Sequence, residues 1–108
     1  DLITTCSISS IYNDLAVFVG TDLGEKVDAI GNNNVIIIGF MTHMCVTFTA
    51  QGAFLRGNHA TVVADACATR ALQTSVSEVS ALNLHSSALA TINDLYAVVV
   101  PSAAELSD

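Results

Sequence analysis

Residues 35–46 read VIIIGFMTHMCV, an apolar run that ends at a glycine and leads into a cysteine-containing segment. The consecutive β-branched residues, bounded by the polar residues 32–34 and by Gly39, predict a strand buried on both faces, as in a parallel sheet. Thr42 is placed to cap a helix over 42–57, and Gly57 is a natural C-terminal stop. A buried strand followed directly by a helix predicts an α/β fold.

The rest of the chain continues this alternation. Helices are expected over 22–30, capped by Thr21 and Gly31, and over 75–93, with Val79, Leu82 and Leu89 facing inward. Further strands are expected over 2–8, 60–64 and 96–100. The alternating order predicts a single domain with a doubly wound, mostly parallel sheet in a three-layer α-β-α arrangement.

Composition narrows the class of function. Three basic residues against ten acidic ones, with a pI near 4.4, argue against a nucleic-acid-binding surface. No apolar stretch approaches the ~18 residues of a membrane span, and nothing resembles a signal peptide, so we expect no membrane partner and a cytoplasmic location. Cys6, Cys45 and Cys67 show neither paired metal spacing nor the density of a disulfide scaffold, which fits a reducing compartment.

Cys45 is the candidate catalytic residue. It is expected in the first turn of the helix over 42–57, at the carboxyl edge of the sheet, where ligands of open α/β sheets generally bind. Unpaired N–H groups and the helix dipole there stabilise a thiolate and a neighbouring oxyanion. The alternative is that Cys45 is a small buried hydrophobic residue, the commoner fate of a cysteine in an apolar chain.

Other side chains near this edge are weaker candidates. Phe40 could form part of an apolar pocket wall, although such residues more often belong to the core or to a subunit interface. His43 could line the pocket, bind substrate or point to solvent. Asp65, at the end of the next strand, could order the pocket, but a turn-capping role is favoured because Asp routinely bonds its own backbone in turns. Cys67 is expected to be structural. His59 and His85 offer no pair at helical spacing, so neither a metal nor another cofactor is expected.

Three segments carry a resemblance to a known family. GFMTHMCV at 39–46 resembles the Gly-x-x-Thr-x-x-Cys-Val signature of the isochorismatase-like cysteine hydrolases, which include nicotinamidases and N-carbamoylsarcosine amidases. FVGTDL at 18–23 is similar to the family's Phe-x-Gly-Thr-Asp-Leu segment, and 57–68 resembles its Gly-x-x-Val-x-Val-Val-x-Asp-Ala segment. Together they cover residues 18–70 in the family's order and spacing. The resemblance implies that residues 1–108 are an incomplete domain, because a full member needs nearly twice that length.

The resemblance also implies a chemistry. Members use a Cys, Asp and Lys triad, a thioester or related covalent intermediate, and an oxyanion hole of backbone amides. The cysteine carries over to Cys45, the oxyanion amides to Thr42 and Cys45, and the family's cis peptide to Met41–Thr42. Such a bond costs about 3 kcal/mol and would mark a strained functional turn. Family members commonly form homo-oligomers.

The other two triad members have no counterpart. Asp1 and Asp14 are the acids upstream of the motif, and neither stands in the family's Asp-x-Gln-like context. Thr5 or Tyr12 occupies roughly the place of the lysine, and Lys26 falls inside the helix after Thr21. Two functions follow from different classes: a hydrolase that cleaves a small-molecule amide through Cys45, or a degenerate, non-catalytic domain that binds a ligand or a partner chain.

Overall fold

The computed structural model describes residues 2–5, 18, 22–31 and 33–106, and for 2–5 only the backbone. Its main sheet has four strands in the order β1-β2-β3-β6. Their bounds are β1 Leu2–Thr5, β2 Asn34–Gly39, β3 His59–Cys67 and β6 Val98–Val100. The helices are α1 Leu23–Ile30, the π-helix η1 Thr42–Val46, α2 Thr47–Leu55, α3 Ala81–Leu95 and the 3₁₀-helix η2 Ala103–Glu105. Strands β4 Leu72–Gln73 and β5 Glu78–Val79 form a separate hairpin.

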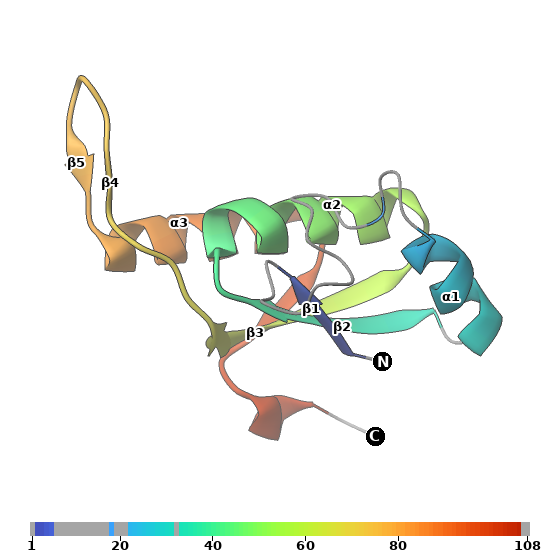
Figure 1. Ribbon diagram of the computed structural model, residues 1–108. Coiled ribbons are helices and arrows are strands. Elements are labelled where there is room, and N and C mark those ends of the chain that lie inside the picture. Colours follow the sequence, from blue (N-terminus) through green and yellow to red (C-terminus); the bar gives the residue numbers. More distant parts are fainter. Residues whose placement is uncertain (1, 6–17, 19–21, 32, 107–108) are drawn as a thin grey trace.

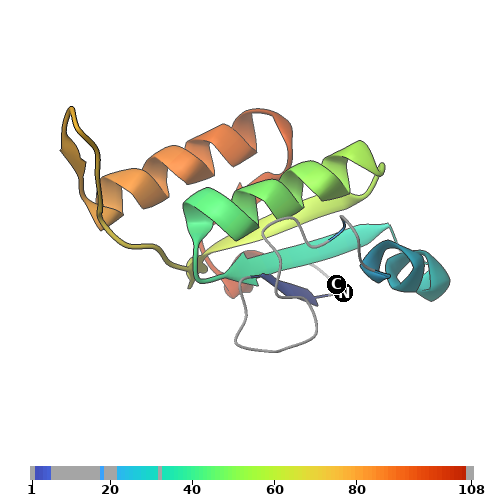
Figure 2. The same cartoon turned by 45° about the horizontal axis from the view of Figure 1, so that its top comes forward.

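All neighbouring strands of the main sheet run parallel, which confirms the predicted α/β class. Helices α2 and α3 lie side by side over one face of this sheet (Figures 1 and 2). The strands of the main sheet follow one another in chain order. In a doubly wound sheet the strand order reverses at one point, and the described residues do not contain that reversal. They therefore supply two of the three predicted layers.

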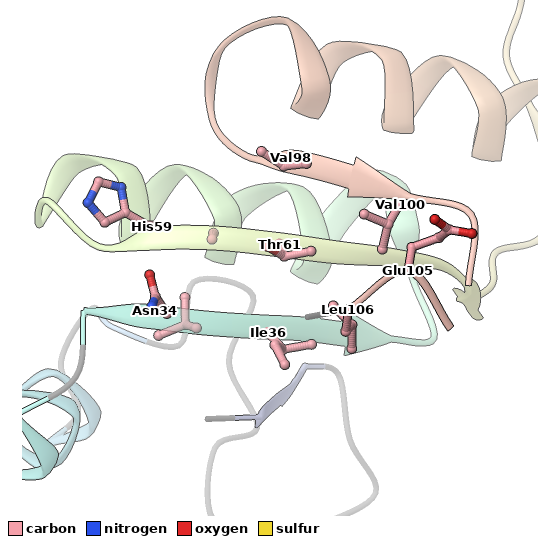
Figure 3. A pocket seen from close by; sticks show the side chains of 10 residues that line it. Asn34, Ile36, His59, Thr61, Val98, Val100, Glu105 and Leu106 are labelled. Carbon is pink, nitrogen blue, oxygen red and sulfur yellow. The ribbon is translucent and has the colours of Figure 1, made fainter. Parts of the chain in front are cut away.

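Strand β2 is buried unequally on its two faces. Val35 and Ile37 are buried against the helices, whereas Ile36 and Ile38, on the opposite face, are half-buried. The prediction of full burial on both faces is thus wrong for the described residues, because α2 and α3 cover one side only. On the other side Ile36 and Leu106 help to line a hollow of about 400 Å³ (Figure 3).

The core lies between the sheet and the helices. Ile37 and Val62 from the sheet meet Val46, Ala50 and Ile92 from the helices, and all five are fully buried. The buried residues of α2 are small, namely Thr49, Ala50 and Ala53, whereas α3 contributes the larger Ile92 side chain.

Helix α3 differs most from its prediction. The helix expected over 75–93 begins at Ala81, because Thr74 Oγ1 accepts hydrogen bonds from the backbone N–H groups of Val76 and Ser77 and closes a hairpin turn. Ser80 then caps α3 by accepting the Asn83 N–H at 3.1 Å. Leu82, predicted to face inward, lies in the first turn of α3 and is 72% exposed to solvent.

The remaining elements lie close to their predicted ranges. Strands β2 and β3 extend beyond 35–38 and 60–64 at both ends, and β6 begins later than 96. Helix α1 begins one residue after 22 and ends at Gly31, which has the expected left-handed φ of 78°. The proposed cap Thr21 and the end of the strand predicted over 2–8 lie outside the described residues.

Gly57 ends the segment after α2 with φ of 84°, as predicted from its place at the helix end. A methyl group at this position would meet no atom within 4 Å, so the only cost of a side chain is the left-handed backbone. We expect Gly57→Ala to lower the free energy of unfolding by about 1 kcal/mol and Gly57→Asn to lower it less. Urea unfolding of both variants checks this, and an equal cost for the two would contradict it.

Candidate active site

The carboxyl ends of the first three strands meet at one edge of the sheet. Gly39 ends β2 and pairs with Cys67 at the end of β3, while the backbone of Thr5 pairs with Gly39 from the other side. The segment η1, which carries Cys45, follows this edge directly. The predicted location of the cysteine at the carboxyl edge is therefore confirmed.

Thr42 lies inside η1 and does not cap it. Its side chain is fully buried, and its Oγ1 and its backbone N–H both donate to the Ala68 carbonyl at 3.0 Å. The predicted N-cap role is wrong, because the Thr42 hydroxyl is hydrogen-bonded to the Ala68 carbonyl and to a histidine ring that is described below. A π-helix widens the turn by one residue and is often found at functional sites.

The predicted oxyanion geometry at Met41–Thr42 is also wrong. No peptide bond among the described residues is cis, so this one is trans. A non-proline cis bond needs surroundings that repay about 3 kcal/mol, whereas the trans form here lets the Thr42 N–H bond the Ala68 carbonyl. That N–H is thus engaged within the protein and is not directed at an open oxyanion position.

Cys45 is buried, with 1% of its surface exposed, and its sulfur is disulfide-bonded in this structure. The expectation of reduced cysteines is contradicted at this residue, and its partner lies outside the described residues. A sulfur in a disulfide cannot act as a thiolate nucleophile. Any catalytic role of Cys45 belongs to the reduced protein.

His43 contacts the loop after β3. Its Nδ1 lies 2.6 Å from Thr69 Oγ1. Partial burial, and then the positive charge of Arg70, lower the pKa of His43 below its usual value. The lowered pKa favours the uncharged ring, so His43 is a poor source of the positive charge that the missing lysine would supply.

Of the three predicted pocket residues, His43 lines a hollow that is formed by described residues. His43 lines a hollow of about 270 Å³ with residues of α2 and α3, namely Thr47, Leu84, Ser87, Ala88 and Thr91. Phe40 is 57% exposed and is not part of it. Asp65 is exposed inside β3, with its N–H donating to the Pro101 carbonyl, so it neither lines this hollow nor caps a turn.

Sequence reasoning missed His85. Its Nδ1 lies 2.8 Å from Thr42 Oγ1, which links α3 to the beginning of η1. A usable signal was present in the sequence, because His85 lies three and seven residues before the buried Ala88 and Ile92 and so shares their helix face.

The basic side chains of the described residues lie in different places, and Arg70 is close enough to His43 for its charge to lower the pKa of that ring. Lys26 forms an ion pair with Asp22 on α1, and Arg56 pairs with Asp28. Over the same residues, no three His, Cys, Asp or Glu side chains gather as a metal site would require. No helix in the described part is both long and apolar enough to cross a membrane.

Cys67 is the free cysteine of the described chain and is buried. Burial raises the pKa of its thiol, the negative charge of Asp65 adds to the rise, and a hydrogen bond with the Gly39 backbone opposes it. The thiolate is therefore disfavoured in the folded state, as expected of the structural role that the sequence predicted.

We expect iodoacetamide to modify Cys67 in the folded protein only above the ordinary thiol range of about pH 8.5. Because the folded pKa is raised, the associated stability is present below the unfolded pKa and is lost as pH rises through the folded pKa. Peptide mass spectrometry across a pH series, with the urea-unfolded chain as control, measures the modification. Equal rates for folded and unfolded protein at pH 8 would contradict the assignment.

Comparisons with known proteins agree with the fold and the motif. The model of the isochorismatase domain matches residues 13–104. The isochorismatase family protein YddQ of Bacillus subtilis is 38% identical over 82 residues, covering 76% of this chain and 46% of its own. Nicotinamidase 3 of Arabidopsis thaliana is 40% identical over 57 residues, which are 53% of this chain and 29% of that protein.

A solved structure shares the fold of this chain. The crystal structure of an isochorismatase from Pseudomonas putida superposes with a TM-score of 0.80 at 33% identity, over 84% of this chain and 47% of that one. The chain spans about half the length of YddQ and of this crystallised relative. A family model that covers most of the chain, together with the shared fold, shows that this chain belongs to the isochorismatase family.

Proposed function

We propose that the protein hydrolyses a small-molecule amide at its C–N bond, with reduced Cys45 as the nucleophile. The observation that carries the proposal is the place of Cys45 in η1, directly after the carboxyl end of β2, within the family's Gly-x-x-Thr-x-x-Cys-Val pattern. The similarity to Nicotinamidase 3 supports an amide substrate.

The proposed reaction has two steps. The Cys45 thiolate attacks the amide carbonyl carbon, the C–N bond breaks, and a proton passes to the departing nitrogen to leave a thioester. Water then hydrolyses the thioester, which releases the carboxylic acid and restores the thiol. The base that ionises Cys45 is not assigned: Lys26 is paired with Asp22 on α1, and His43 is hydrogen-bonded through Nδ1 to Thr69.

A non-catalytic domain is the second candidate, and two observations favour it. The sulfur of Cys45 is disulfide-bonded, and the Thr42 N–H is already engaged by the Ala68 carbonyl. In this alternative the cysteine is structural, and the domain serves ligand binding or association with another chain.

Reduction separates the two candidates. We would incubate the full-length protein with nicotinamide and other small carboxamides, with and without dithiothreitol, and measure the ammonia released. Ammonia that forms only after reduction supports the hydrolase. No ammonia from any carboxamide, with the cysteine shown by mass spectrometry to be reduced, favours the non-catalytic domain.

A further inference from the structure

The buried hydroxyl of Thr42 has two polar neighbours from different parts of the chain. Ala68, in the loop after β3, presents its carbonyl oxygen at 3.0 Å, and His85, on α3, presents Nδ1 at 2.8 Å. Because Thr42 has no exposed surface, water does not compete for these contacts. The three residues form a chain of hydrogen bonds at the beginning of η1.

The proton count fixes the direction of this chain. A hydroxyl carries one proton, and Thr42 Oγ1 donates it to the Ala68 carbonyl. Its contact with His85 is then satisfied when Nδ1 carries a proton and donates to the Thr42 oxygen. The reverse direction would leave two oxygen lone pairs facing each other at 3.0 Å in a buried site, which is unfavourable.

The backbone N–H and carbonyl of Thr42 are also hydrogen-bonded. Its N–H donates to the Ala68 carbonyl, its own carbonyl accepts from Thr47 Oγ1 at 2.6 Å, and the Ala68 N–H donates to Gly39. The turn between β2 and η1 is therefore tied to β3, to α2 and, through His85, to α3. Cys45 lies within this turn of η1, so its position depends on these bonds.

We propose that His85 is a positioning residue: by donating from Nδ1 to Thr42 Oγ1 it holds the η1 turn in the geometry that Cys45 needs for reaction. This inference rests on the proposed hydrolase function as far as turnover is concerned. His85 acts through Thr42 and is not assigned a contact with substrate.

Substitutions at His85 can separate geometry from general packing. The side-chain amide nitrogen of Asn is attached to Cγ, as Nδ1 is in histidine, so Asn can place an N–H donor at the same point. The amide of Gln lies one carbon further out and cannot. Ala removes the donor altogether. A purely structural role would not distinguish Asn from Gln by the position of their donors.

The test compares His85→Asn, His85→Gln and His85→Ala in the full-length, reduced protein. We expect kcat/KM for amide hydrolysis to fall about tenfold in His85→Ala and His85→Gln, the effect of one buried hydrogen bond, and to stay near the wild-type value in His85→Asn. The exchange rate of the Thr42 amide hydrogen, measured by NMR, should rise about tenfold in the same two variants only.

Amide exchange needs no substrate, so it tests the role of His85 even if the protein proves to have no amidase activity. Equal exchange rates in His85→Asn and His85→Gln, or a wild-type rate in His85→Ala, would overturn the proposal. A ¹⁵N spectrum that shows His85 Nδ1 without a proton at pH 7.5 would overturn it as well. Thermal unfolding of each variant confirms that the folded state is being compared.

Discussion

Replacement of Cys45 by alanine is expected to reduce amide hydrolysis by at least about 10³-fold in the presence of reductant, because no thioester can form without the sulfur. The folded structure should persist, since alanine fits where cysteine is buried and reductant removes the disulfide from both proteins. The measurement is the steady-state release of ammonia, with the fold followed by circular dichroism.

Cys67→Ala is the matched control. It makes the same chemical change at another buried cysteine, located at the end of β3. Because burial raises the pKa of the Cys67 thiol, this residue is not expected to be a nucleophile, and its removal should leave turnover within about twofold of wild type. Unchanged turnover in Cys45→Ala would eliminate Cys45 as the nucleophile.

Local patterns predicted the order of the elements well. The apolar run at 35–38 and its alternation with helices predicted the parallel sheet. Gly31 and Gly57, which both have positive φ, marked the ends of two helices. These features depend on residues close together in sequence, such as β-branched side chains or a glycine with positive φ. Their physical causes can therefore be read from the chain itself.

The site was less predictable because it depends on contacts between distant segments. Ala68 is 26 residues from Thr42, and His85 is 43 residues from it, yet these partners determine what the Thr42 hydroxyl and N–H do. The sequence indicated that Thr42 could cap a helix. In the structure its hydroxyl and N–H instead form hydrogen bonds with the distant residues Ala68 and His85. The disulfide of Cys45 likewise could not be found from spacing alone.

Ile92→Ala is expected to have the largest effect on stability among substitutions on α3. Ile92 has no exposed surface and packs with Ile37 and Val62 of the sheet, so truncation leaves a cavity at the centre of the core. Substitutions of this kind cost about 2–5 kcal/mol. Urea unfolding of the variant and the wild type measures the loss as a lower midpoint at unchanged slope.

Leu82→Ala is the control on the same helix. Because Leu82 is 72% exposed, its truncation should change the free energy of unfolding by no more than about 0.5 kcal/mol. A larger loss for Leu82 than for Ile92 would mean that α3 presents the face predicted from the sequence, with Leu82 inward.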